Sequence, residues 1–226
     1  MFFDPMYFVF IAPAILLALW AQWRIHATYA QAQQVPAPLS GAAAARHILD
    51  SAGLHDVAIE PTPGHLTDHY DPRDRVLRLS EAVYHQRSLA AVGIAAHEAG
   101  HALQHGYGYV PLAVRNAAVP VTSFGSNASF VLLLLGLLFS LPALLWAGII
   151  AFSGVVFFEL VNLPVEFNAS DRAKAELAAL GIVSPQEMVY VDRVLGAAAL
   201  TYVAATLQGI LTLLYLILRF GGSSRD

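Results

Sequence analysis

Two histidines and a glutamate stand in one short stretch at metal-binding spacing: His97, Glu98 and His101. Residues four apart in an α-helix leave the same face, so both imidazoles can bind one Zn²⁺. Glu98 then lies beside such an ion and can accept a proton from its bound water. The pattern His-Glu-x-x-His therefore predicts a zinc hydrolase. The alternative is that the two histidines are ordinary residues on a helix surface.

The stretch that carries these residues is predicted to be one helix. Ser88 can cap its N-terminus, and Gly106 ends it. Ala99 and Gly100, between the histidines, are small and allow another element to approach closely.

His105 continues the same stripe, but it lies too far along the helix to be a third ligand. Eight residues at about 1.5 Å rise place its backbone roughly 12 Å from that of His97. We expect His105 either to contact a metal-binding residue without binding the ion itself or to lie on the surface. A catalytic zinc needs a third protein ligand, with the fourth position left to water. Because the chain has no cysteine, the ion must be held by histidine and carboxylate.

The composition predicts a membrane protein. Of the 226 residues, 57% are hydrophobic and only 12% are charged, whereas an ordinary soluble domain has about 25% charged residues. The net charge of -4 is small and dispersed, without the basic run that binds nucleic acid. We therefore expect no nucleic-acid partner.

Four apolar intervals are long enough to cross about 30 Å of hydrocarbon. The first, residues 5–23, is preceded by Asp4 rather than by a basic residue, so we expect a retained span rather than a secretory signal. The others are residues 120–140, 143–165 and 194–218.

The second and third spans are predicted to fold back on each other at Ser140-Leu141-Pro142. The uncharged interval around them is too long for one span and too short for three. The polar residues Ser126, Asn127 and Ser129 are expected to make contacts between helices rather than to line a transport path.

The polar segment, residues 24–118, is predicted to be the water-facing domain. We expect a helix over residues 42–52, a short strand over 56–60, and a hairpin of residues 66–70 and 75–79. The second hairpin strand could hold an extended substrate by strand addition. The alternative is a hairpin that only covers the metal helix.

Two carboxylates compete for the third ligand position. Two membrane spans return the chain to the side that holds the histidines, and Glu166 lies there, on a helix that Pro164 starts or kinks. Glu159 lies earlier on the same helical face, and a carboxylate within a span is by default a functional candidate. The expected depth favours Glu166.

Beyond Glu166, Gly181 is predicted to close a helix. Ser184-Pro185-Gln186-Glu187 has the composition of a helix start, with proline at the first position and a capping-box glutamate.

Four sequence blocks together resemble one known family: Phe3-Asp4-Pro5, Leu66-Thr67-Asp68-His69-Tyr70-Asp71-Pro72, Ala96-His97-Glu98-Ala99-Gly100-His101-Ala102 and Leu163-Pro164-Val165-Glu166-Phe167-Asn168-Ala169-Ser170. This is the YugP-type family of bacterial membrane zinc metallopeptidases. The chain is also distantly similar to the HtpX-like membrane proteases, whose pattern supplies a glutamate ligand in Glu-x-x-Ala-Asp. Here Ser170 stands at the place of that aspartate, and Asp171 follows one residue late. The resemblance implies Zn²⁺ held by His97, His101 and Glu166, and a role in membrane proteolysis or quality control.

The predicted fold is a mainly α membrane protein with four transmembrane helices and a small α+β zincin-like domain between the first two. The chain is divided into five parts. They are the first span (residues 1–23), the metal-binding domain (24–118), a transmembrane hairpin (119–165), the third-ligand helix with its polar segment (166–193), and the last span with its tail (194–226).

Basic residues predict the orientation in the inner (plasma) membrane. Five of them lie near span ends on the catalytic side, against Arg219 and Arg225 on the other. By the positive-inside rule the catalytic side is cytoplasmic and both termini lie outside. The five are Arg24, Arg115, Arg172, Lys174 and Arg193.

The predicted reaction is hydrolysis of a peptide bond by a zinc-activated water, with Glu98 as the base. Arg172, Tyr190 and His69 are alternatives for stabilising the oxyanion, although His69 and His65 can equally be solvated loop residues. The substrates are expected to be membrane-associated proteins or peptides, cut at or just outside the surface of the bilayer.

Two other classes stay open. A transporter would place polar groups along several spans, as Glu159, Asn127 and Asn162 do in part. A non-catalytic membrane scaffold could hold a structural zinc, although such sites usually have four protein ligands.

Overall fold

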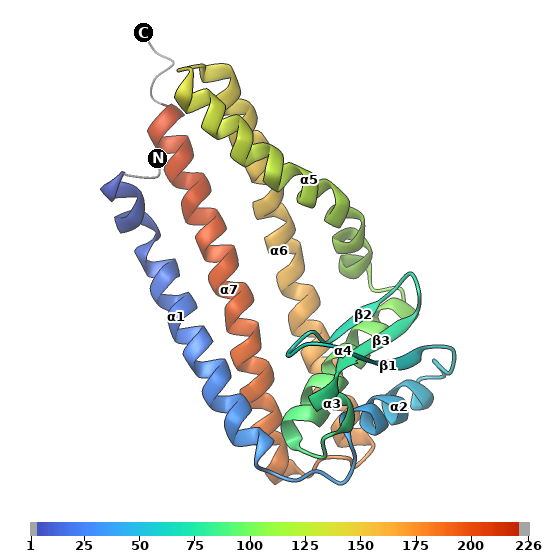
Figure 1. The fold of residues 1–226 in the computed structure, drawn as a ribbon. Helices are drawn as coiled ribbons and strands as arrows, with labels where there is room; N and C mark the ends of the chain where they lie inside the picture. Colours follow the sequence, from blue (N-terminus) through green and yellow to red (C-terminus); the bar gives the residue numbers. More distant parts are fainter. Residues whose placement is uncertain (1–3, 222–226) are drawn as a thin grey trace. The chain divides into compact units, whose positions relative to one another are not determined.

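The computed structural model describes residues 4–221, without the side chain of Val121. Phe3 of the first sequence block and Arg225 of the orientation argument lie outside the described residues. In chain order the elements are α1 (Pro5–Gln33), α2 (Gly41–Ser51), β1 (Ala58–Thr62), β2 (His69–Asp71), β3 (Val76–Ser80), α3 (Glu81–His85), α4 (Leu89–Gly106), α5 (Val110–Leu138), α6 (Pro142–Ala179) and α7 (Pro185–Gly221) (Figure 1).

The chain is mainly helical, as predicted. Among the described residues, α1, α6 and α7 are each long and apolar enough to cross a membrane. Helix α5 bends by 46° between Val110–Pro120 and Thr122–Leu138, and it makes a fourth candidate if the two parts form one span. Three to four candidate membrane helices thus accompany the small sheet.

The helices are longer than the predicted apolar spans. Helix α1 continues to Gln33 because no glycine or proline follows residue 23 within it. The segment after Pro185 and the last apolar run form one helix, α7, which starts in the predicted capping box: Glu187 N donates to Ser184 Oγ at 3.3 Å, and Ser184 N to Glu187 Oε2 at 2.9 Å. Pro164 lies inside the 38-residue α6 rather than at a helix start. Apolar length marks what can be buried in lipid, whereas helix ends depend on breakers and caps.

The chain divides into two compact units. The first contains residues up to Trp20, Val114–Leu163 and those from Leu200 on. Within it, the predicted fold-back joins α5 to α6 at Ser140, whose φ is +52°. The two helices pack closely there, because a Cβ on Gly136 would lie 2.8 Å from the backbone nitrogen of Leu145.

Two of the polar residues of α5 form hydrogen bonds within their own helix. Asn127 Nδ2 donates to Ser123 O at 3.2 Å, and Ser129 Oγ donates to Ser126 O at 2.9 Å. Both bonds stay within α5, because short polar side chains can reach the carbonyls of the preceding turn of their own helix.

The second unit contains Ala21–Ala113 and Pro164–Ala199. Its three-stranded sheet has the order β1-β3-β2, with β1 parallel and β2 antiparallel to β3. The predicted hairpin is therefore present. Its second strand, however, is the central strand, so β3 is paired on both sides and cannot add a substrate strand. Among the described residues, β1 and β2 are the strands that pair on one side only. The hydrophobic pattern predicted strands, but it carried no information about which strand lies between the others.

The core of this unit forms between the sheet, α2 and α4. Leu77 and Leu79 alternate along β3 and are fully buried, and they pack in one cluster with Ile48 and Leu49 of α2 and Leu103 of α4. This burial fixes which face of the sheet meets the metal helix.

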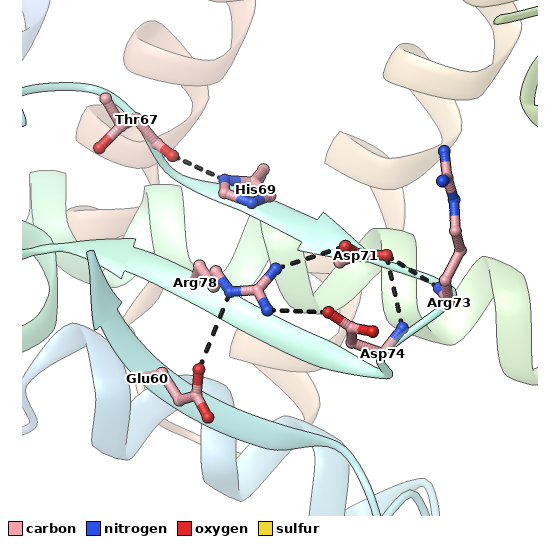
Figure 2. A network of polar contacts seen from close by, with 7 residues as sticks. All are labelled: Glu60, Thr67, His69, Asp71, Arg73, Asp74 and Arg78. Atoms are coloured by element: carbon pink, nitrogen blue, oxygen red, sulfur yellow. Dashed lines mark hydrogen bonds and ion pairs between the residues drawn. The ribbon is translucent and has the colours of Figure 1, made fainter. Parts of the chain in front are cut away.

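Arg78 follows Leu77 on β3, and its side chain connects the central strand to its neighbours (Figure 2). Its Nε lies 3.8 Å from Glu60 on β1, and its two terminal nitrogens lie 3.3 Å from Asp71 on β2 and 3.0 Å from Asp74 in the turn. The hydrogen bonds from the backbone of Arg73 and Asp74, and then the Arg78 guanidinium, hold the pKa of Asp71 below its usual range against a smaller effect of burial. One side chain on the central strand thus contacts both edge strands and the turn.

We expect Arg78→Met to lower the midpoint of thermal unfolding by several degrees, because it removes three carboxylate contacts at once. Arg73→Met, in the same turn, is the matched control, since Arg73 contacts Asp71 through its backbone nitrogen, which the substitution keeps. Circular dichroism of the purified variants would measure both. Equal midpoints for the two variants would show that the Arg78 contacts do not hold the sheet.

Candidate metal centre

Helix α4 carries the two histidines and starts and ends as predicted. Ser88 caps it, with Oγ accepting a hydrogen bond from Ala91 N at 3.2 Å, and its last residue is Gly106. The cap supplies an acceptor to one of the otherwise unpaired amides of the first turn. The helix is regular through His97 and His101, which therefore stand one above the other on one face.

Helix α6 crosses α4 at a glycine. A Cβ on Gly100 would lie 2.4 Å from the carbonyl oxygen of Ala169, so the two backbones meet at a distance that only glycine allows. The crossing lies between the two histidines of α4 and beside Glu166 of α6. The small residues predicted to admit another element do so here.

Glu166 meets both imidazoles at this crossing. His97 Nε2 lies 3.4 Å from Glu166 Oε2, and His101 Nε2 lies 3.7 Å from Glu166 Oε1. One ligand atom from each of the three residues lies within 4.8 Å of the others, and Glu166 is only 3% exposed.

This donor set fits a zinc ion. At metal–ligand distances of about 2.1 Å, tetrahedral ligand atoms stand about 3.4 Å apart, close to the separations of 3.4 Å and 3.7 Å between Glu166 and the two imidazoles. Two histidines and one carboxylate also leave a fourth position for water. Glu159, the alternative ligand, is not part of the cluster, and neither is His105.

The far nitrogens of both imidazoles are held by Ser170 and by Gln104, and no role was predicted for either residue. His97 Nδ1 lies 3.0 Å from Ser170 Oγ, and His101 Nδ1 lies 3.0 Å from Gln104 Oε1. Contacts of this kind orient metal-binding histidines. Ser170 could have been found, because it stands where the HtpX-like pattern has an aspartate, and its hydroxyl occupies that supporting position here. Gln104 could have been found from its spacing, one turn after His101.

Glu98 is buried and lies next to His97 in sequence. Burial raises the pKa of its carboxyl to about 7, with smaller and opposing effects from His97, which lowers it, and from Glu166 and Asp68, which raise it. Burial alone would lower the pKa of the neighbouring His97, but contact with Glu166 and the charge of Glu98 outweigh it and raise the pKa. A carboxyl group that titrates near neutral pH can both take up and release a proton under physiological conditions.

The three other histidines that the sequence analysis considered have partners of their own. His105 Nδ1 lies 2.9 Å from the hydroxyl of Tyr70, so it joins the end of α4 to the edge strand β2. The ring of His65 packs against Tyr29, and His69 Nδ1 lies 2.8 Å from Thr67 O.

The three candidates for oxyanion stabilisation have different surroundings. The guanidinium of Arg172 donates from Nε to Asn168 Oδ1 at 2.8 Å and lies over the rings of Tyr107 and Tyr109. Tyr190 packs against the core of the second unit. His69 is close enough to Glu98 for its charge to affect the pKa of that carboxyl.

A glutamate held between two imidazoles, with a buried carboxylic acid next to one of them in sequence, defines the class of His-Glu-x-x-His zinc metallopeptidase sites. Residues 7–221 match the sequence model of the family described as "Putative neutral zinc metallopeptidase", and the chain belongs to this family. A relative from Bacillus subtilis (strain 168), named "Putative membrane protease YugP", is 47% identical over 218 residues, which make up 95% of this chain and 97% of that protein. No solved structure matches the chain. The family resemblance seen in the sequence blocks is thus confirmed.

Proposed function

We propose that this protein is a membrane-integrated, zinc-dependent metalloendopeptidase. The observation that carries the proposal is the meeting of Glu166 with His97 and His101, at separations that suit one tetrahedral ion. In this assignment the three residues are the metal ligands. The family to which the chain belongs, and the word protease in the name of its relative, support the same reaction class.

In the proposed mechanism a bound Zn²⁺ supplies Lewis acidity, which polarises the scissile carbonyl and makes water nucleophilic near neutral pH. Glu98 is the catalytic residue that accepts the proton of this water and delivers it to the departing amine. Its pKa of about 7 in the metal-free site suits both steps. The positive charge of a bound metal ion would lower the pKa of Glu98, which favours its ionised, proton-accepting form before water attacks the peptide carbonyl.

The proposed substrates are membrane or membrane-proximal proteins. Support comes from the three to four candidate membrane helices and from the polar sequence that surrounds the metal helix. We infer four spans in the inner membrane, with α5 as one bent span. The basic residues near the span ends then favour a cytoplasmic catalytic side and cleavage at or just outside the bilayer surface.

An extended substrate can pair with an open edge of the sheet, and we assign this role to β2 rather than to β3. Support comes from the edge position of β2 and from its contact with the metal helix, where Tyr70 meets His105. Main-chain pairing at an edge strand gives affinity with little dependence on sequence.

The metal content of purified wild type, Glu166→Ala and Glu159→Ala, measured together with cleavage of casein and of a membrane-protein substrate, tests the proposal. We expect wild type and Glu159→Ala to hold one zinc per chain and to cleave. We expect Glu166→Ala to lose cleavage and to bind zinc much more weakly. The loss of affinity should exceed the roughly 10- to 100-fold that is typical when a residue supporting a ligand is removed. Zinc bound equally well by Glu166→Ala would overturn the ligand assignment, and a zinc-loaded wild type that cleaves neither substrate would overturn the activity.

A further inference from the structure

We propose that Gln104 is a positioning residue that selects the tautomer of His101. In this role its side-chain oxygen accepts a hydrogen bond from the Nδ1–H of His101, so that the proton-free Nε2 faces Glu166. The inference concerns the supporting contacts of the centre rather than its ligands. It rests on the proposed function only in taking Nε2 as the metal-binding atom.

Gln104 is fully buried, and its polar atoms have three partners on two helices. Its Oε1 lies 3.0 Å from His101 Nδ1 on its own helix. Its Nε2 donates to Val165 O at 2.7 Å and to Asn168 Oδ1 at 3.1 Å, both on α6. These two acceptors flank Glu166 in sequence, so the same amide joins the helix of the histidines to the helix of the carboxylate.

The orientation of the amide follows from what its partners can do. A backbone carbonyl such as that of Val165 only accepts hydrogen bonds, so the nitrogen of Gln104 must face it. Asn168 requires the same orientation of Gln104. Arg172 can only donate hydrogen bonds, and its Nε lies 2.8 Å from Asn168 Oδ1, so this atom is an acceptor and the nitrogen of Gln104 must donate to it. The amide oxygen of Gln104 is therefore turned toward His101, where it can only accept. His101 must then carry its proton on Nδ1.

His97 has no such constraint from its own partner. Its Nδ1 faces the hydroxyl of Ser170 at 3.0 Å, and a hydroxyl can donate or accept. The contact with Ser170 therefore holds the ring of His97 without choosing its tautomer. Of the two supporting contacts, only the one from Gln104 carries a fixed direction.

The tautomer can be measured on the metal-free protein, without any assay of cleavage. Histidine side chains labelled with ¹⁵N report by NMR which ring nitrogen carries the proton, at alkaline pH where free imidazoles are neutral. Signals that disappear in His101→Gln identify His101. We expect the Nδ1–H form in wild type. The Nε2–H form in wild type would overturn the proposal, whatever the protein cleaves.

Zinc affinity, measured by competition with a chelator, tests the consequence. Gln104→Met keeps the approximate length of the side chain but removes its hydrogen bonds, and we expect it to weaken zinc binding about 10- to 100-fold and to leave His101 in mixed tautomers. Leu103→Met places the same residue one position earlier in the core and should change the affinity by less than about twofold. Asn168→Leu should fall between them, because Val165 still orients the amide. Wild-type affinity in a folded Gln104→Met would contradict the proposal, and if that variant does not fold, the wild-type tautomer decides.

Discussion

Glu98→Gln is expected to lower the rate of peptide hydrolysis by about 10²- to 10⁴-fold, the usual effect of removing a general base, while zinc content stays at the wild-type level. Glutamine has nearly the size of glutamate but cannot accept the proton of the attacking water. Because Glu98 is not one of the three residues of the candidate metal cluster, its replacement leaves the donor set intact. The measurement is the initial rate of cleavage together with zinc per chain.

The control for this variant is Glu81→Gln, which removes the same charge at an exposed position in the same unit. It should keep wild-type rates. A zinc-loaded Glu98→Gln that cleaves as fast as wild type would show that another group is the base.

The free energy of unfolding of Glu98→Gln shows whether its loss of activity comes from the missing base or from a damaged fold. Burial raises the pKa of Glu98 from 4.5 to about 7, whereas the unfolded chain ionises at the ordinary value. In the metal-free protein this carboxyl therefore costs nothing below about pH 4.5; the cost grows as the pH rises and levels off above about 7, on the order of 3 kcal/mol. Metal-free Glu98→Gln should be more stable than wild type at about pH 8 and equal to it at about pH 4, so unfolding cannot be the cause of its inactivity.

The second large effect is expected for Gly100→Ala, which should weaken zinc binding and reduce cleavage about 10²-fold. The new Cβ would lie 2.4 Å from the carbonyl oxygen of Ala169, and its nearest neighbours are all backbone atoms of Ala169, so no flexible side chain can give way. The helices must move apart by about 1 Å to reach an ordinary C···O distance. A displacement of that size at a catalytic constellation can cost about 10²-fold.

Gly93→Ala on the same helix is the matched control. Its Cβ would lie 3.2 Å from a methyl group of Val191, which is a side-chain atom and can shift slightly. Alanine is also the better helix former by about 1 kcal/mol, so neither variant weakens α4 itself. We expect wild-type zinc affinity for Gly93→Ala. Similar losses in both variants would mean that the close crossing at Gly100 is not what holds the ligands together.

Much of the local structure could be predicted, because it depends on residues a few positions apart. The Ser88 cap, the end of α4 at Gly106 and the capping box before α7 are contacts within one or two turns, and all three are present. The fold-back at Ser140 is equally local. The order of the strands was not predictable, since it depends on how the hairpin meets a strand from another part of the chain.

The sequence by itself determined the membrane character of the chain and the two histidines with Glu98 on one helix face, because composition and the 3.6-residue period need no tertiary contact. Only the tertiary structure decided that Glu166 rather than Glu159 meets the imidazoles, that Gln104 and Ser170 hold their far nitrogens, and that β3 lies between β1 and β2. These choices depend on where α6 crosses α4, at a close approach of Gly100 to Ala169. The small residues of α4 predict that some element approaches closely, but which helix approaches, and at which residue, is set by the shape and volume of both helices.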